Sequence, residues 1–286
     1  MTEPEVAFVL PAGGSTGAVQ VGILRALAER GVRPDVLVGC SVGALNATFF
    51  ALDPGVAQAR MLARVWHMLS RRDIFGTGRT RTLARIIGRR DHIFDPRPLR
   101  SLIRSLVPLD DLENAPTPVH VVTTDLDMGV AQWWTRGPVH ELLYASACLP
   151  GLFPPAVIDG RRHVDGGVLE PIPVNRAIDT DARVIYVLGQ TVGFGEDDAP
   201  QLAALHVLLR CFGISRYARL PDPTSLARVG QRVIVVPGAP AGGIDITDFS
   251  HTDELISASV SRAHRFLDGV EGSVEPSAAE LHHSDR

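Results

Sequence analysis

Continuous apolar runs alternate with helical patterns along most of the chain. The runs over 6–10 and 36–38 are typical of strands buried on both faces of a parallel sheet, and apolar residues at helical spacing between them predict a helix over 18–30. Further strands are expected over 119–125, 131–135, 157–164 (a hairpin turning near Asp159-Gly160), 184–189 and 233–236. Further helices are expected over 44–51, 56–69, 95–106, 139–147, 202–212 and 253–267. This alternation, with no internal repeat and no clear linker, predicts one α/β domain with a mainly parallel sheet.

The segment Gly39-Cys40-Ser41-Val42-Gly43 stands between the second predicted strand and the helix that follows it. It matches the pattern G-x-S-x-G, in which a sharp strand-to-helix turn presents a serine hydroxyl at the carboxyl end of a sheet. Gly39 and Gly43 leave room where a side chain would collide with a neighbouring element. Ser41 would lie at the amino end of the helix, where free N–H groups favour developing negative charge. Because the pattern alone also fits a serine that only caps a helix, Ser41 is a candidate nucleophile that needs a partner.

A glycine-rich loop, residues 11–17, follows the first predicted strand. A dinucleotide site would need a glycine where Ala12 stands and an acidic residue at the end of the second strand, where the chain has Gly39. A purely structural tight turn is a second interpretation.

We favour a third interpretation of this loop, an oxyanion hole. A βαβ unit places the ends of its two strands side by side, so the loop after the first strand can face Ser41 and stabilise a tetrahedral intermediate there. The expected donors are the backbone N–H groups of Gly13, Gly14 and Ser15.

The composition excludes several classes of protein. Hydrophobic residues make up 45% of the 286 residues, enough for a sizeable core, and a net charge of −4 argues against binding to nucleic acids. The three cysteines, Cys40, Cys148 and Cys211, are too few and too widely spaced to indicate a disulfide framework or a zinc site. The first residues, Met-Thr-Glu-Pro-Glu, do not match the basic and apolar pattern of a secretory leader, and no apolar run reaches roughly 18 residues. We therefore expect a cytoplasmic protein, with peripheral membrane contact left open.

An arginine-rich segment interrupts the alternating pattern. All 28 basic residues of the chain are arginines, and ten of them fall between positions 71 and 104, interleaved with apolar residues. One interpretation of the segment 71–107 is a solvated helical insertion. The other is a basic, partly apolar lid that meets an anionic lipid surface.

A serine hydroxyl is a poor nucleophile until a base takes its proton. The segment Asp165-Gly166-Gly167 follows an apolar loop, and its glycines would let a carboxylate approach a site without obstruction. On its own this segment is a common turn. A dyad needs only Asp165 within hydrogen-bond reach of Ser41, whereas a triad would add His251, which follows them in the order of the α/β-hydrolases. His163 would share a strand face with Asp165, and we interpret it as structural.

The combination of these motifs resembles the patatin-like phospholipase family over roughly residues 5–180. A strand, a glycine loop and a helix come first, then the elbow of Ser41, then Asp165 about 120 residues later. Supporting details are the run CSVGALNA from Cys40, the segment 146–155 with its Phe-Pro, and Pro173 and Asn175 after the Asp-Gly-Gly-Val run.

The resemblance implies a three-layer α/β/α sandwich with a Ser–Asp dyad and no catalytic histidine. Ser41 would be the acyl-accepting nucleophile, Asp165 the general base and the 12–17 loop the oxyanion hole. The motif glycines would be Gly17, Gly39, Gly43, Gly166 and Gly167. The implied reaction is hydrolysis of fatty-acyl esters in lipids, of the phospholipase or lysophospholipase type, or acyl transfer by the same route. No metal and no organic cofactor are expected. The catalytic domain would span residues 1–269, followed by a disordered tail over 270–286.

Two departures from the family pattern fall in the glycine loop, which usually reads G-G-G-x-R/K-G. Ala12 replaces the first glycine and Thr16 the basic residue. The alternative functions are an esterase with a Ser41, Asp165 and His251 triad, or a non-catalytic module that binds a lipid or a nucleotide.

Overall fold

The computed structural model describes residues 4–76, 91–189, 211, 213–215 and 220–271. In this part of the chain eight strands form one mixed sheet in the order β5-β6-β3-β2-β1-β7-β8, with β4 paired to β3 outside that path. The strands are β1 (Val6–Leu10), β2 (Val36–Cys40), β3 (Val119–Asp125), β4 (Val130–Trp134), β5 (Ala156–Ile158), β6 (Arg161–Asp165), β7 (Val184–Leu188) and β8 (Arg232–Val236).

The neighbouring strands β3, β2, β1, β7 and β8 run parallel, whereas β4 and β6 each pair antiparallel with β3, and β5 pairs antiparallel with β6. β1 is central, since Val9 pairs with Val38 of β2 and with Val187 of β7. Successive side chains point to opposite faces, so Phe8 belongs to one core cluster and Val9 to another. Burial on both faces explains the continuous apolar runs of these strands.

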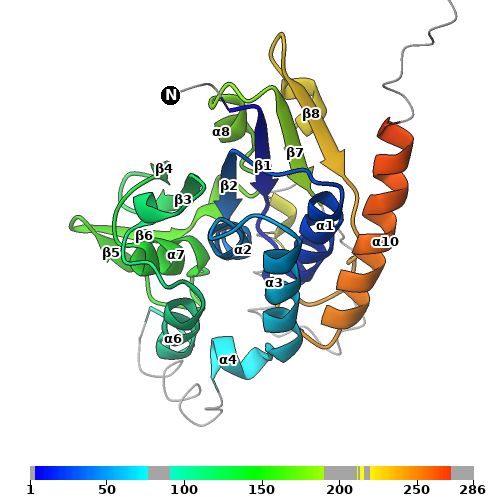
Figure 1. Cartoon of the computed structure of the whole chain (residues 1–286). Coiled ribbons are helices and arrows are strands. Elements are labelled where there is room, and N and C mark those ends of the chain that lie inside the picture. The colour runs from blue at the N-terminus through cyan, green and yellow to red at the C-terminus, as the bar shows by residue number, and fades with distance from the viewer. Residues whose placement is uncertain (1–3, 77–90, 190–210, 212, 216–219, 272–286) are drawn as a thin grey trace, which may run out of the picture.

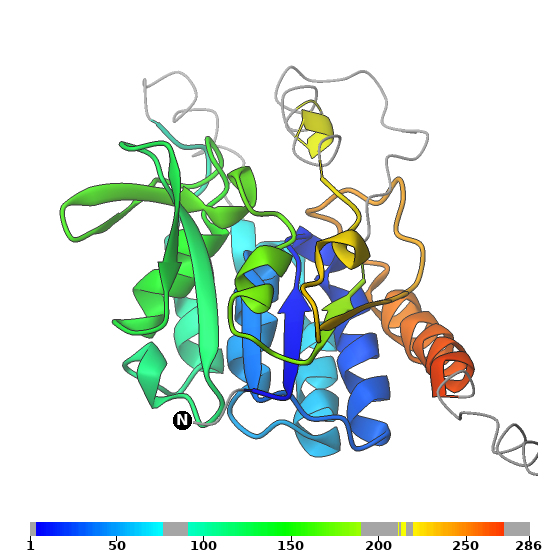
Figure 2. The same cartoon turned by 90° about the horizontal axis from the view of Figure 1, so that it is seen from above.

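The longer helices gather on one face of the sheet. The α-helices are α1 (Ala18–Glu29), α2 (Val42–Phe50), α3 (Val56–Met68), α4 (Arg71–Phe75), α6 (Arg97–Leu106), α7 (Val139–Ala147), α8 (Val174–Ile178) and α10 (Thr252–Glu271). Short 3-10 turns are η1 (Gly14–Gly17), η2 (Leu112–Asn114), η3 (Gly166–Val168) and η4 (Pro223–Leu226). Figure 1 shows α1, α2 and α3 side by side in front of the sheet, and α10 packs against α1 along one flank. Figure 2 shows the same arrangement from above.

Two large apolar clusters divide most of the core between the two faces of the sheet. The larger one joins the sheet to α1, α2, α3, α6, α7 and α10, with Phe50 and Tyr144 among its fully buried side chains. The smaller one covers the other face, where Val174 and Ala177 of α8 pack against Val9 and its neighbours. Helices on both faces of a mainly parallel sheet confirm the expected three-layer α/β/α sandwich.

Most predicted elements appear close to their expected limits. α1 ends at Glu29, and Gly31 beyond it has a φ of 73°, as a C-terminal glycine should. The predicted hairpin is β5 and β6, with Asp159 (φ 51°) and Gly160 (φ 77°) in its turn. α10 extends to Glu271, beyond the start of the tail predicted over 270–286.

Some predicted segments lie outside the described residues. They are the central part of the arginine-rich segment (77–90), most of the helix expected over 202–212, and 272–286 of the expected tail. Among the helices that are described, none combines the length and the apolar character needed to cross a bilayer.

Candidate active site

Ser41 stands at the junction between β2 and α2. Its backbone is left-handed, with a φ of 57°, a conformation that costs a non-glycine residue about 1–3 kcal/mol. The two motif glycines permit the turn through close contacts. A Cβ on Gly43 would come within 2.0 Å of the Leu10 carbonyl oxygen. A Cβ on Gly39 would come within 2.5 Å of Ala44 Cα. The turn that carries Ser41 therefore packs closely against the end of β1 and the start of α2.

Ser41 and Asp165 are in direct contact. The Ser41 hydroxyl donates to Oδ2 of Asp165 over 2.6 Å, and both side chains are buried. Asp165 ends β6, which pairs with β3, and its Oδ1 accepts the Gly167 N–H at 2.7 Å. A Cβ on Gly166 would lie 2.4 Å from the Val122 carbonyl oxygen, so the turn after Asp165 requires glycine. The carboxylate is held by its backbone with one oxygen aimed at the serine.

Ser146, near the end of α7, binds the backbone of the candidate nucleophile. Its hydroxyl oxygen accepts the Ser41 backbone N–H at 3.0 Å, and the same hydroxyl donates to the Val122 carbonyl at 2.7 Å. Ser146 is fully buried. The sequence assigns it no role, because a serine at the end of an apolar helix has no local signature.

The glycine loop begins beside the elbow and continues into η1. The Ser15 N–H donates to the Ile246 carbonyl at 2.8 Å, so it is not free to stabilise an oxyanion, contrary to the expectation from sequence. Among the described residues, no backbone acceptor receives the N–H of Gly13 or of Gly14. Gly14 also lines the same pocket as Ser41. The candidate oxyanion hole thus reduces to the N–H groups of Gly13 and Gly14.

Both departures from the family loop are accommodated by hydrogen bonds. The Ala12 N–H donates to the Pro171 carbonyl at 2.8 Å. Ala12 is not one of the described residues with a positive φ, so its backbone does not need a glycine. The Thr16 hydroxyl donates to the Gly13 carbonyl at 2.8 Å. Thr16 therefore closes the loop on itself where a basic residue is usual.

Two buried amide side chains anchor the loop at both ends. Gln20 Nε2 donates to the Pro11 carbonyl at 2.6 Å, before the glycines. Asn46 Nδ2 donates to the Gly17 carbonyl at 3.2 Å, after them, and to Gln20 Oε1 at 3.0 Å. Neither role is visible in the sequence, because each depends on the packing of α1 against α2.

An apolar pocket opens from Ser41 between α2, α3, α4, α6 and α7. The cavity is partly open to solvent. Its lining is Gly14, Ser41, Val42, Leu45, Asn46, Phe49, Leu62, Val65, Trp66, Leu69, Ile74, Phe75, Leu99, Leu102, Leu106, Ala147, Leu149, Phe153, Ile246 and Phe249. Nearly all of these side chains are aliphatic or aromatic, so the pocket suits a hydrocarbon chain whose carboxyl end lies at the serine.

The histidine of the alternative triad stands apart from the dyad. The His251 ring lies 3.7 Å from Asp248 and 3.8 Å from Glu254, and 44% of its side chain is exposed. The direct contact between Ser41 and Asp165 leaves no space for an imidazole between them. The Ser41, Asp165 and His251 triad is therefore not assembled.

His163 is buried on β6 beside the dyad but bonds elsewhere. Its Nδ1 lies 3.1 Å from the Thr123 hydroxyl, and its ring meets Trp134 edge-on. Burial lowers the pKa of His163, so the ring is neutral near pH 7. Its contacts are those of a packing residue.

The cysteines supply no second nucleophile in this pocket. Burial raises the pKa of Cys148 to about 12, so its thiol stays protonated. Cys40 is also buried, while Cys211 is exposed. Across the described ranges, no group of three or more metal-binding side chains is arranged around a common point.

The described part of the arginine-rich segment makes several local contacts. Arg97 pairs with Asp95, and Arg100 pairs with Glu141 while it lies 3.8 Å from the Tyr144 ring centre. Both arginines therefore make contacts within the protein in addition to carrying charge at its surface.

Comparisons with known proteins indicate the family of this chain. The family model described as patatin-like phospholipase matches residues 8–178. An uncharacterised NTE family protein of Mycobacterium tuberculosis is 31% identical over 209 residues, covering 71% of this chain and 54% of that protein. The patatin-like phospholipase domain-containing protein 7 of Rattus norvegicus is 30% identical over 190 residues, covering 66% of this chain and 14% of that protein. The lysophospholipase NTE1 of Coccidioides immitis is 24% identical, covering 92% of this chain and 18% of that protein.

The chain spans about half the length of the mycobacterial relative and a small part of the other two. Among solved structures, VipD from Legionella pneumophila aligns with 95% of this chain and 67% of its own, at 14% identity and a TM-score of 0.47. The family match covers the elbow, the glycine loop and the Asp-Gly-Gly turn together. The chain belongs to the patatin-like phospholipase family.

Proposed function

We propose that this chain is a serine acyl hydrolase that cleaves fatty-acyl ester bonds of lipids, of the phospholipase or lysophospholipase type. The observation that carries the proposal is the 2.6 Å hydrogen bond from Ser41 Oγ to Asp165 Oδ2, with Ser41 in the lining of an apolar pocket. Family membership and the names of the relatives, one of which is called a lysophospholipase, support the same assignment.

The first half of the reaction forms an acyl-enzyme. Asp165 Oδ2 takes the hydroxyl proton as Ser41 Oγ attacks the ester carbonyl carbon. The carbonyl oxygen becomes an oxyanion and accepts hydrogen bonds from the N–H groups of Gly13 and Gly14. The tetrahedral intermediate then collapses, the bond to the alcohol oxygen breaks, and the departing alcohol receives the proton from Asp165.

The second half regenerates the enzyme. A water molecule gives a proton to Asp165 as its oxygen attacks the acyl carbonyl of Ser41. Collapse of the second intermediate releases the fatty acid and returns the proton to Ser41 Oγ. Because Gly167 holds Oδ1 throughout, Oδ2 can serve as base and as acid without reorienting.

The pocket supports a substrate with a long apolar acyl chain. Side chains from five helices surround the space beyond Ser41, and burial of methylene groups there contributes about 0.8 kcal/mol each. The same lining offers no charged side chain. We therefore place the acyl chain in the pocket and the alcohol portion of the ester outside it.

Labelling with a fluorophosphonate probe tests this function. Wild-type protein should be labelled at Ser41 and should hydrolyse p-nitrophenyl esters and lysophosphatidylcholine, and Ser41→Ala should lose both. The control is Ser105→Ala, which removes an exposed serine on α6. A folded wild-type protein that binds a dansylated fatty acid but is neither labelled nor active would favour the non-catalytic lipid-binding module.

We also propose that the catalytic domain predicted over 1–269, which the structure extends to the end of α10 at Glu271, acts as one domain of a cytoplasmic protein, and that its segment 71–107 contacts anionic membranes. Support comes from exposed Arg72, which lines a surface hollow together with Met68, 76% exposed. Arg104 adds a second charge, with 62% of its side chain exposed. Sedimentation with anionic vesicles should be strong at low salt and should weaken as salt is added, because surface charges are screened. Sedimentation that is absent or unaffected by salt would contradict the contact.

A further inference from the structure

The segment 245–249, between β8 and α10, lies directly on the glycine loop. The Ser15 N–H donates to the Ile246 carbonyl at 2.8 Å, and the Ser15 hydroxyl donates to the Asp245 carbonyl at 2.9 Å. A Cβ on Gly14 would lie only 2.5 Å from the Ile246 carbonyl oxygen. Gly14 and Ser15 of the loop therefore pack closely against the carbonyl groups of Asp245 and Ile246. We call the segment 245–249 the strap.

The strap also forms one wall of the acyl pocket. Ile246 and Phe249 line the pocket together with Ser41. The Phe249 ring packs on the Trp66 ring at 6.0 Å between centres, and Trp66 Nε1 donates to Asn46 Oδ1 at 2.9 Å. The strap thus touches the loop that would hold the oxyanion and the cavity that would hold the chain.

Local hydrogen bonds give the strap a defined shape. Oδ1 of Asp245 accepts both the backbone N–H and the hydroxyl of Thr247 at 2.7 Å, and Oδ1 of Asp248 accepts the Ser250 N–H at 2.9 Å. Arg71 Nε lies 3.4 Å from the Thr247 hydroxyl, which it reaches from α4. These contacts fix the backbone carbonyls that face the glycine loop.

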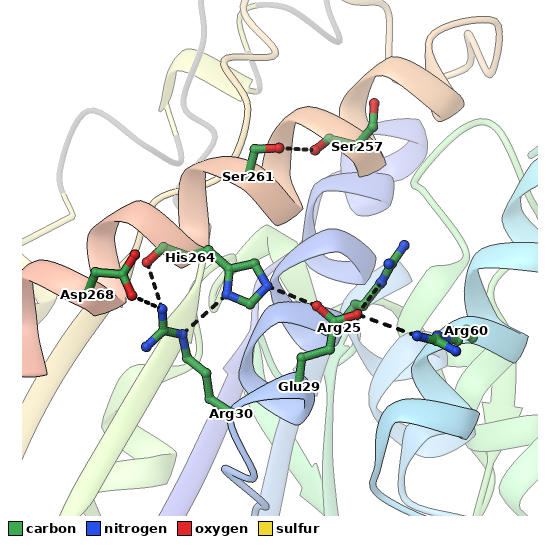
Figure 3. Close-up of polar contacts among 8 residues, drawn as sticks. All are labelled: Arg25, Glu29, Arg30, Arg60, Ser257, Ser261, His264 and Asp268. Carbon is green, nitrogen blue, oxygen red and sulfur yellow. Dashed lines mark hydrogen bonds and ion pairs between the residues drawn. The ribbon is translucent and has the colours of Figure 1, made fainter.

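The downstream end of the strap is held by the docking of α10 on α1. Figure 3 shows the polar contacts of this interface: His264 Nε2 lies 2.9 Å from Glu29, and Arg30 bonds both to the His264 carbonyl at 3.1 Å and to Asp268. Near the start of α10, Asp253 pairs with His67 of α3. The strap therefore connects two elements that are held in place by their own contacts, β8 and α10.

We propose that the strap is a positioning and selectivity element of the active site. Through Ser15 it holds the glycine loop so that the Gly13 and Gly14 N–H groups point at the oxyanion, and through Phe249 it limits the acyl chains that fit. The inference rests on the proposed hydrolase function. It goes beyond the family match, which ends at residue 178 and does not include the strap.

The physical need for such an element follows from the loop itself. Glycines adopt many backbone conformations, so a loop built from them holds a catalytic geometry only if neighbours restrict it. The amides at Gln20 and Asn46 restrict its two ends, and the strap restricts its middle. A misplaced oxyanion donor lowers the rate of the chemical step without weakening substrate binding.

The selectivity part is tested with Phe249→Ala. The matched control is Phe266→Ala, which removes the same side chain from a similarly half-buried position on α10 that does not line the pocket. With p-nitrophenyl esters from butyrate to palmitate, Phe249→Ala should raise the ratio of kcat/KM for long chains to that for short chains by roughly tenfold, and the control should not. An unchanged ratio in Phe249→Ala would overturn the selectivity role.

The positioning part is tested with Ser15→Ala, which removes the hydroxyl bonded to Asp245. We expect kcat and the rate of fluorophosphonate labelling to fall by roughly tenfold while KM stays the same. The control is Thr180→Val, which removes a partly buried hydroxyl that donates to the Ala177 carbonyl at the end of α8, on the other face of the sheet. If Ser15→Ala and Thr180→Val have the same kcat, Ser15 is only structural and the positioning role fails.

A binding measurement keeps the strap testable even if turnover is absent. In a Ser41→Ala background, Phe249→Ala should change the relative affinities for dansylated fatty acids of different lengths. Absence of Ser41-dependent turnover in wild type would defeat the proposed function alone. Identical affinity profiles with and without Phe249 would defeat the strap's selectivity role whether or not the protein is an enzyme.

Discussion

Ser41 and Asp165 are 124 positions apart in the chain, yet the hydroxyl of one donates directly to the carboxylate of the other over 2.6 Å. The parallel pair β2 and β3 and the antiparallel pair β3 and β6 bring them together through their register. Cys40, the residue before Ser41, lies beside Val122, and Asp165 lies beside the next residue of β3, Thr123. The contact supplies both a base and its orientation. It is the feature from which the proposed chemistry follows.

Loss of the Ser146 hydroxyl should destabilise the protein. Ser146→Ala leaves the buried Ser41 N–H and the Val122 carbonyl without their present partner, and an unsatisfied buried polar group costs about 1–3 kcal/mol. Urea denaturation should show a loss in this range. The control is Ser105→Ala, at an exposed helical site, where the change should stay within about 0.5 kcal/mol. Equal stability of the two variants would show that the elbow does not depend on Ser146.

The amide at Gln20 should matter for rate more than for binding. Gln20→Leu removes the bond to the Pro11 carbonyl at the start of the glycine loop, so the oxyanion donors lose an anchor. We expect kcat to fall by roughly 10- to 100-fold with little change in KM. The matched control is Gln58→Leu, because Gln58 is also buried and also donates to a backbone carbonyl, that of Phe49, away from the loop. A similar loss of kcat in both variants would point to general destabilisation instead.

Narrowing the pocket at its α6 wall should shorten the preferred acyl chain. Leu102→Trp places a larger side chain on the α6 wall, where it would compete with the distal methylenes of a long chain. Hydrolysis of the palmitate ester should fall by roughly tenfold or more relative to the butyrate ester. Leu126→Trp, at a 45% exposed site outside the pocket, should leave this ratio unchanged. If both esters are hydrolysed as in wild type, the chain lies elsewhere.

His120 should make the protein less stable in acid. Burial lowers its folded-state pKa from 6.5 to about 4, and Arg176 Nε donates to its Nδ1 at 3.0 Å. Between these values the unfolded chain binds the proton and the folded chain does not, so stability falls as pH drops from 6.5 towards 4. Between pH 7 and pH 5 this group alone should remove on the order of 2 kcal/mol.

The measurement for His120 is the free energy of unfolding at several pH values for wild type and His120→Asn. The asparagine can still accept a hydrogen bond from Arg176 but does not titrate. The variant should therefore lose less stability than wild type between pH 7 and pH 5. Parallel pH profiles would mean that other groups cause the acid sensitivity.

Much of the fold could be predicted because its signals are local. β1 and β2 are continuous apolar runs, and the elbow of Ser41 needs Gly39 and Gly43 for contacts within a few residues and with the adjacent strand. The Asp-Gly-Gly turn is likewise a short pattern with a local cause, since Gly167 bonds the carboxylate of Asp165. Short motifs of this kind indicate which residues form the turns, and the pairing of the strands then brings these turns together.

The remaining parts of the site depend on contacts that no local pattern records. Ser15 was expected to donate to the oxyanion, but its hydroxyl and N–H are taken by a segment 230 positions away. His251 follows Ser41 and Asp165 in a familiar order, yet it lies in an exposed position at the start of α10. Chain order carries no information on such distances, so these relationships emerge only from the packing of α10 and the strap.

The most direct test of the central claim is the kcat/KM of Asp165→Asn for a p-nitrophenyl ester, measured beside His251→Ala. Asparagine keeps the shape of the side chain but cannot take the Ser41 proton, so kcat/KM should fall about a thousandfold or more, while His251→Ala should stay within about twofold of wild type. Full activity in a folded Asp165→Asn protein, or a collapse of activity in His251→Ala, would contradict the Ser41–Asp165 dyad.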